Sequence, residues 1–252
     1  MNKANFTVIR LTRVLTMIST LVVLSVTVYA AYLAVDNTLL GRSVNASTEP
    51  SFPIVIIDPG HGGEDGGALS ADGTVEKDIN LAVSQCAEKI FSFFGFKTLM
   101  TRDKDELIYS SDCTNIREKK VSDIHNRMKI IEENPNSIFL SVHQNHYDGE
   151  RYNGAQVFYS KNNEKSPILA QCIQETIKSD LQENNDRKIK PTGTEIYLLY
   201  HAQVPCVMVE CGFLSNREEA KKLGDGEYQK QMAFEIFKGT YEYFVRNGGK
   251  DG

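Results

Sequence analysis

Two histidines and two glutamates could act together in metal chemistry, because each stands next to a predicted secondary-structure element. His61 in DPGHGG and His143 in SVHQN follow or end apolar runs, Glu210 follows the run VPCVMV, and Glu76 stands just ahead of a helical pattern. Two imidazoles and one carboxylate leave the fourth position of a tetrahedral Zn²⁺ open for water, which suits catalysis. A remaining carboxylate could act as general base and general acid.

The spacing of these residues indicates a metal site without fixing it. The chain has five histidines, and a single polar residue after a strand is more often a turn residue than a ligand. The sequence has no HExxH segment, so a zincin-type protease is disfavoured.

Short apolar runs alternate with helical patterns over most of the chain. Strands are predicted over residues 54–57, 96–101, 138–142, 155–159, 196–199 and 206–209. Helices are predicted over residues 77–94, 123–133, 167–181, 216–223 and 228–244, with Ser215 or Asn216 as a helix cap. This order predicts a single α/β domain with a mostly parallel or mixed six-stranded sheet and helices on both faces. Ligands of such sheets bind at the carboxyl ends of the strands, where we expect the metal site.

The charge is divided unevenly along the chain. There are 28 Lys and Arg against 33 Asp and Glu; residues 1–50 carry a net charge of +2 and residues 51–252 one of −7. An acidic domain without a long basic run is a poor nucleic-acid binder, because neutralising phosphates requires clustered Lys and Arg.

Residues 14–35 form an uncharged run of 22 residues preceded by three basic residues. This length can span a membrane as a helix, with the basic flank in the cytoplasm. A cleaved signal peptide is the alternative for residues 1–35, with Val28-Tyr29-Ala30 as a cleavage region. Both interpretations export the rest of the chain. Residues 36–53 read as a polar linker and residues 54–252 as the catalytic domain.

The five cysteines show no disulfide framework and no CxxC metal motif. Their number is odd, and several fall in predicted helices or apolar strands, so buried free thiols are expected.

Five segments in order resemble the zinc-dependent N-acetylmuramoyl-L-alanine amidases of the bacterial cell wall, the amidase-3 family. They are IVIIDPGHGGEDGGA, EKDINLAV, GFKTLMTRDKD, FLSVHQNHY and PCVMVECGFLSN, within residues 54–244. The segment NDRKIKPTGTEIYLLYHAQVPCVMVECGFLSNREEAKKL is most similar to the spore-cortex, germination-specific members.

The resemblance implies specific roles. His61, Glu76 and His143 would bind Zn²⁺, and Glu210 would be the catalytic carboxylate. Asp58 and Asn145 are candidates to hydrogen-bond the ligand imidazoles or contact substrate, and Arg127 matches a family arginine expected to be an ion-pair or structural residue. His146 departs from the family pattern, and it is not expected to be a ligand; neither are His125 and His201.

The expected reaction is hydrolysis of the amide between N-acetylmuramic acid and L-alanine in peptidoglycan, in spore cortex maturation. The resemblance implies a cooperating deacetylase that forms muramic lactam. The lack of spare sequence for a lid predicts control by timing, location or a separate extracytoplasmic protein. Predicted elements nearly fill the 67-residue interval between His143 and Glu210, so no internal lid over the zinc is expected.

Three alternatives stay open. One is a zinc exopeptidase or another amidohydrolase on a similar sheet. A second is a catalytically silent wall-binding module, which would be expected to lose a ligand or the base, although all four positions are present. A third is a Cys211 nucleophile with His201, which is disfavoured because Cys211 adjoins Glu210 and no orienting acid is evident.

Overall fold

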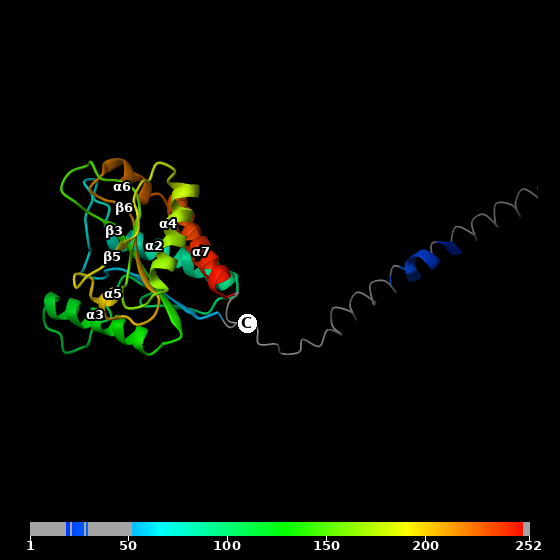
Figure 1. The fold of residues 1–252 in the computed structure, drawn as a ribbon, viewed down its shortest axis with the longest axis horizontal. Helices are drawn as coiled ribbons and strands as arrows, with labels where there is room; N and C mark the ends of the chain where they lie inside the picture. Colours follow the sequence, from blue (N-terminus) through cyan, green and yellow to red (C-terminus); the bar gives the residue numbers. More distant parts are fainter. Residues whose placement is uncertain (1–18, 21, 28, 30–51, 249–252) are drawn as a thin grey trace, which may run out of the picture. The chain divides into compact units, whose positions relative to one another are not determined.

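A computed structural model describes residues 19–20, 22–27, 29 and 52–248 (Figure 1). The chain divides into two units, Met1–Ser51 and Phe52–Gly252, and the second unit holds the sheet and its helices. Most of the apolar run and nearly all of the linker predicted near the N-terminus lie outside the described residues. Among the residues that are described, no helix is long and apolar enough to cross a membrane.

The domain is built on one mixed sheet in the strand order β2-β1-β3-β6-β4-β5. Neighbouring strands are parallel except β4 and β6, which are antiparallel. The strands are β1 (Ile54–Pro59), β2 (Thr98–Met100), β3 (Ser137–Asn145), β4 (Gln156–Tyr159), β5 (Lys190–Pro191) and β6 (Cys206–Phe213). The predicted α/β architecture with a mostly parallel, six-stranded sheet is confirmed.

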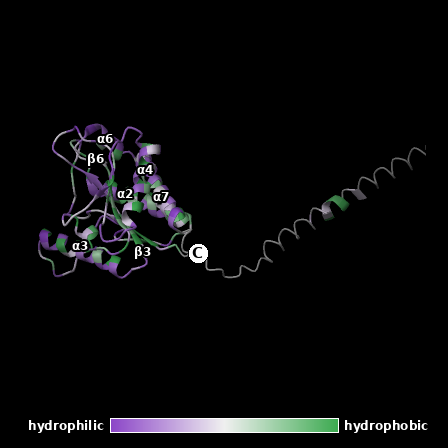
Figure 2. Ribbon diagram, in the orientation of Figure 1, coloured by the Kyte–Doolittle hydropathy of each residue, from purple (hydrophilic) through white to green (hydrophobic). Residues whose placement is uncertain are grey.

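Helices cover both faces of the sheet, as predicted (Figure 1). One face packs against α2 (Glu76–Phe93), α4 (Ser166–Thr176) and α7 (Gly226–Gly248), and the other against α3 (Ile116–Glu132) and α5 (Tyr197–His201). A π-helix (Ile177–Leu181) extends α4, and α6 (Arg217–Leu223) follows β6. Figure 2 shows apolar strands in the middle and helices of mixed polarity around them.

Alternation along β3 explains the two cores. Ile138, Leu140 and Val142 join the core under α2, α4 and α7, whereas Phe139 joins the core under α3 and α5. Successive side chains of a strand point to opposite faces, so His143 shares the face of Phe139. His143 lies at the end of that face, beyond the core residues, and its side chain is 20% exposed.

The predicted strand over residues 196–199 is wrong. Ile196 is extended, but Tyr197–His201 form α5, whose Leu198 and Leu199 are buried in the core that α3 shares. A run of four apolar residues fits one helical turn as well as a strand. The sixth strand is β5, which pairs in parallel with the end of β4. It has two exposed residues and ends in a proline, which is tolerated at a sheet edge but gives no apolar pattern.

Asparagine side chains cap the first turns of two helices. The side chain of Asn216 accepts from the amides of Glu218 and Glu219 at the start of α6, as predicted for this cap. Helix α3 begins seven residues earlier than predicted, at Ile116, where the Asn115 side chain caps Glu118 N. The first turns of α3 are mostly exposed, so they carry no apolar periodicity.

Candidate metal and catalytic site

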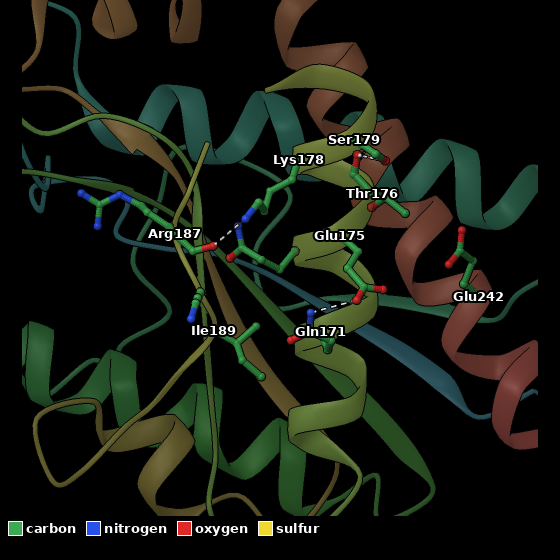
Figure 3. Close-up of a pocket in the computed structure, with 10 residues that line it drawn as sticks. Gln171, Glu175, Thr176, Lys178, Ser179, Arg187, Ile189 and Glu242 are labelled. Atoms are coloured by element: carbon green, nitrogen blue, oxygen red, sulfur yellow. Dashed lines mark hydrogen bonds between the residues drawn. The ribbon is translucent and has the colours of Figure 1, made fainter. Parts of the chain in front are cut away.

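The predicted metal ligands and Glu210 lie at one edge of the sheet, away from the hollow beside α4. The hollow in Figure 3, beside α4, is lined by Gln171, Glu175, Thr176, Lys178, Ser179 and Ile189, among others, and contains none of the predicted metal ligands or Glu210. Strands β1, β3 and β6 run parallel, so their carboxyl ends meet at one edge. The predicted site residues come together at this edge.

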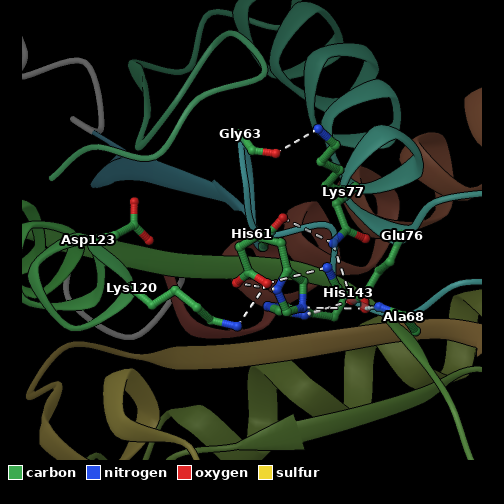
Figure 4. Close-up of polar contacts among 12 residues, drawn as sticks. His61, Gly63, Ala68, Glu76, Lys77, Lys120, Asp123 and His143 are labelled. Carbon is green, nitrogen blue, oxygen red and sulfur yellow. Dashed lines mark hydrogen bonds and ion pairs between the residues drawn. The ribbon is translucent and has the colours of Figure 1, made fainter. Parts of the chain in front are cut away.

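His61, Glu76 and His143 converge at this edge (Figure 4). Each offers one ligand atom, and these atoms lie within 4.8 Å of one another. His61 Nε2 is 3.3 Å from Glu76 Oε2, and His143 Nδ1 is 3.0 Å from Glu76 Oε1. Two imidazoles and a carboxylate at this spacing fit a tetrahedral zinc site with one open position.

Glu76 is the buried member of the triad, at the first turn of α2. Its Oε2 accepts from Ala68 N, and its Oε1 accepts from Gln144 N, at 2.8 and 3.0 Å. Burial opposes ionisation, but hydrogen bonds from the His143 and His61 rings keep the pKa of Glu76 well below its usual range. The carboxylate is therefore ionised and held in place, as a metal ligand requires.

Two glycines make room for the ligands. A Cβ on Gly60 would lie 2.1 Å from His143 Nε2. A Cβ on Gly67, which has φ +70°, would lie 2.5 Å from Glu76 Oε2 and 2.7 Å from His61 Cδ2. Any side chain at these positions would occupy the space of the ligand side chains.

The His61 backbone is held in a conformation that L-residues rarely adopt, with φ +60°. Its carbonyl oxygen accepts from Arg127 Nη2 at 2.8 Å. A strained ligand residue persists only where its surroundings fix it, and Arg127 supplies part of that restraint.

Asp65 orients the His61 ring and was not among the residues that the sequence predicted for this role. Its Oδ2 lies 2.8 Å from His61 Nδ1, and its Oδ1 accepts from Lys120 Nζ at 2.8 Å. Burial disfavours the His61 cation, but hydrogen bonds to Asp65 and Glu76 raise the pKa of His61 to about 9. The available signal was the spacing of four residues between His61 and an acid in the same turn.

Asp58 is placed against Arg127 rather than against a ligand histidine. It is buried and accepts from Thr101, Ser141 and Arg127 at 2.6 Å each. Arg127 also pairs with Asp123 at 2.7 Å. Asn145 ends β3 at a register irregularity, and its carbonyl oxygen accepts from Leu214 N.

Glu210 lies level with His143, on the adjacent parallel strand. Its Oε2 is buried and has no hydrogen-bond partner among the described residues. Burial is the main cause that raises the pKa of Glu210 to about 7; the charge of Glu76 adds to it, and His143 and His61 oppose it. A carboxyl group poised near neutrality can both accept and return a proton.

The remaining histidines take no part in the triad. His125 and His201 both pack on the Tyr197 ring, at 5.2 and 4.3 Å between centroids. The Cys211 thiol is buried, and burial raises its pKa well above the ordinary value, which disfavours a thiolate nucleophile. All five cysteines are free.

The elements between His143 and Glu210 are β4, α4, the π-helix, β5 and α5. The two strands belong to the sheet, α4 packs on α7 and β4, and α5 packs on α3. The helices of this interval in the described domain thus belong to the two layers that cover the sheet.

Known proteins share this domain. The family model described as N-acetylmuramoyl-L-alanine amidase, Amidase_3, matches residues 55–241. The germination-specific N-acetylmuramoyl-L-alanine amidase of Bacillus subtilis (strain 168) is 34% identical over 198 residues, which are 79% of this chain and 82% of that protein. The CwlD amidase of Clostridioides difficile, solved in complex with the GerS lipoprotein, matches with a TM-score of 0.75 and 38% identity, over 77% of this chain and 100% of that one. An N-acetylmuramoyl-L-alanine amidase from Clostridium difficile 630 matches with a TM-score of 0.68 and 28% identity, over 79% of this chain and 100% of that one.

Proposed function

The chain belongs to the Amidase_3 family of N-acetylmuramoyl-L-alanine amidases, and from that premise we propose that it binds Zn²⁺ through His61, Glu76 and His143 and acts on the peptidoglycan of the spore cortex. The activity itself, hydrolysis of the amide between N-acetylmuramic acid and L-alanine in peptidoglycan, follows from the family. The binding of Zn²⁺ and the action on the spore cortex are what we propose.

The observation that supports the mechanism is the strand register. Glu210 on β6 and His143 on β3 are direct partners on neighbouring parallel strands. Zn²⁺ at the triad would lower the pKa of a bound water and polarise the substrate carbonyl. Glu210 would accept the proton of the attacking water and then donate it to the leaving amine of L-alanine. Its pKa near 7 suits both transfers.

The hydrogen bonds that hold the triad side chains support their proposed role as zinc ligands. His61 is oriented by Asp65, and Glu76 is fixed by two backbone amides. An imidazole ligand usually donates its other N–H to an oxygen such as the Asp65 carboxylate, which fixes the tautomer of the ring and raises its basicity. We assign no catalytic role to Arg127 or Asp58, which hold the loop that carries His61.

Activity is tested on purified peptidoglycan by mapping the new termini. The amidase should free stem peptides that begin with L-alanine and leave the glycan strands whole. Chelation should abolish this release until zinc is restored. An exopeptidase would instead free single amino acids from the stem, and a silent wall-binding module would leave every muropeptide intact.

The cortex role is supported by similarity to the germination-specific amidase of Bacillus subtilis. The related CwlD amidase was solved with the GerS lipoprotein, which favours a lipoprotein or other extracytoplasmic partner for this chain too. In that setting a deacetylase would act on the trimmed muramic acid to give muramic lactam. Expression in a Bacillus subtilis strain that lacks its germination-specific amidase should restore muramic lactam to the cortex. Glu210→Gln should not restore it. Lactam-free spores in which the wild-type protein is exported and cleaves peptidoglycan would refute the role.

Action on the wall requires export, which we assign to residues 1–35 as a membrane anchor or a cleaved signal peptide. Fractionation of cells that express the full chain distinguishes the two. An anchor leaves the full-length chain in the membrane fraction, and a cleaved signal gives a shorter chain outside the membrane. Retention in the cytoplasm would contradict both.

A further inference from the structure

A row of three side chains crosses the sheet beside the triad. His143 on β3 pairs level with Glu210 on β6, and Glu210 pairs level with Gln156 on β4. Level residues on neighbouring strands project from the same face, and strands lie about 4.8 Å apart. Gln156 therefore continues the site beyond Glu210, about 10 Å from His143.

Gln156 holds an arginine at the end of this row. Its Oε1 accepts from Arg187 Nη1 at 3.2 Å, and its Nε2 donates to Lys188 O at 2.8 Å. Figure 3 shows the Arg187 guanidinium pointing away from α4, whereas its backbone carbonyl faces Lys178, which donates to it. The charged group is thus directed out of the hollow beside α4.

The guanidinium is fixed in advance. Arg187 Nε donates to Asn153 O at 2.7 Å. The guanidinium carbon lies 4.4 Å from the centroid of the Phe213 ring and 5.9 Å from that of Tyr152. An arginine stacked and hydrogen-bonded in this way loses little further entropy when it binds a ligand.

Arg187 has no acidic partner in the described part of the chain. No carboxylate there lies within ion-pair distance of it, and its Nη2 finds no acceptor. Glu219, whose ionisation Arg187 favours, already accepts from Gly154 N and Phe213 N. The half-buried guanidinium therefore keeps donors available for an acceptor that arrives from outside.

We propose that Arg187 binds the free α-carboxylate of the second stem-peptide residue, a γ-linked D-glutamate, and that the enzyme thereby prefers stem peptides in which this group is not amidated. The inference rests on the function proposed above. In this proposal the leaving amine lies within reach of Glu210 and the stem peptide runs from there toward β4, where Gln156 and Arg187 lie. The α-carboxyl carbon of the second residue lies two residues from the scissile carbonyl, at most about 7 Å away. That distance reaches from the reaction centre to the Gln156–Arg187 pair.

The test compares two muramoyl dipeptides that differ in one group, the α-carboxylate or the α-carboxamide of the second residue. Wild type should cleave the carboxylate form with a kcat/KM about 10- to 100-fold higher, because a charge-assisted pair is lost with the amide. Arg187→Gln should remove this preference by slowing only the carboxylate form, and Arg187→Lys should restore part of it. Unchanged turnover of the amidated substrate would show that the variant is folded and loaded with metal.

Arg151→Gln is the matched control. Arg151 also packs on the Tyr152 ring, at 4.6 Å, but it is exposed, and within residues 52–248 its side chain donates only to the Tyr152 hydroxyl. Its loss should leave the preference intact. Equal cleavage of both substrates by wild type, or a preference that survives Arg187→Gln, would overturn the inference and leave the amidase function standing. Failure to cleave either dipeptide or whole peptidoglycan would overturn the proposed function as well.

Discussion

Arg127 on α3 donates a hydrogen bond to the carbonyl oxygen of His61, at 2.8 Å, and pairs with Asp58 of β1 at 2.6 Å. One buried guanidinium thus connects a helix, a strand end and the strained residue that carries a metal ligand. The backbone conformation of His61 is thus held in part by a buried ion pair that lies outside the triad.

Arg127→Met should lower the free energy of unfolding by about 3–5 kcal/mol, because it leaves the Asp58 charge buried without a partner. Arg217→Met is the control, since Arg217 pairs with Glu150 at the surface, where loss should cost about 1 kcal/mol or less. Urea unfolding at pH 7 measures both. Equal effects would contradict the assigned role.

Glu210→Gln should keep the metal and lose about 10²–10⁴-fold in kcat, because the amide cannot transfer the proton. Zinc content per chain is measured together with the appearance of new N-terminal L-alanine on stem peptides freed from peptidoglycan. Glu195→Gln, an exposed change in the loop before α5, should alter neither. Hydrolysis by Glu210→Gln at the wild-type rate would exclude Glu210 as the base.

The contribution of Glu210 to the stability of the metal-free protein should fall as pH rises from about 4.5 to about 7. Burial raises the folded-state pKa of Glu210 from 4.5 to about 7, so ionisation at higher pH favours the unfolded chain. Glu210→Gln removes this penalty. Its advantage over wild type should grow by about 3 kcal/mol between pH 4 and pH 8, in urea unfolding with a chelator present. A difference that does not change with pH would show that burial leaves the carboxyl unperturbed.

Asp65→Asn should weaken zinc binding about 10- to 100-fold, because the His61 ring loses its ionised hydrogen-bond partner. Competition with a chelating dye gives the affinity without reference to activity. Asp72→Asn serves as the control, since the Asp72 side chain accepts hydrogen bonds from Ser70 and Thr74 in the next turn and has no contact with the triad among the described residues. Comparable affinities for the Asp65 and Asp72 variants would rule out the orienting role.

Gly67→Ala should abolish zinc binding, because the new methyl group would meet Glu76 Oε2 and His61 Cδ2. Gly73→Ala separates this collision from backbone strain. Gly73 also has positive φ, +90°, but no atom lies within 4 Å of the place that its Cβ would take. Gly73→Ala should lose about 1 kcal/mol of stability through backbone strain alone and keep the metal, whereas Gly67→Ala should lose more stability and lose the metal. Normal zinc content in Gly67→Ala would refute the steric argument.

Much of the fold could be predicted from local patterns. The apolar runs of β1, β3 and β6 and the periodic face of α2 are long enough to specify their own structure. The short elements could not be predicted in the same way. Residues 196–199 suit a helical turn and a strand equally, and β5 has only two residues, both exposed. Packing against α3 and pairing with β4 determine what these segments become.

The sequence by itself placed His61, Glu76 and His143 next to elements that a parallel sheet brings to one edge, and its resemblance to the amidases implied their roles. Only the tertiary structure decided their partners. It placed Asp65 rather than Asp58 on His61, and it brought Gln156 and Arg187 beside Glu210. These contacts depend on strand register and loop conformation, which arise from pairing between distant segments and leave no periodic trace in the local sequence.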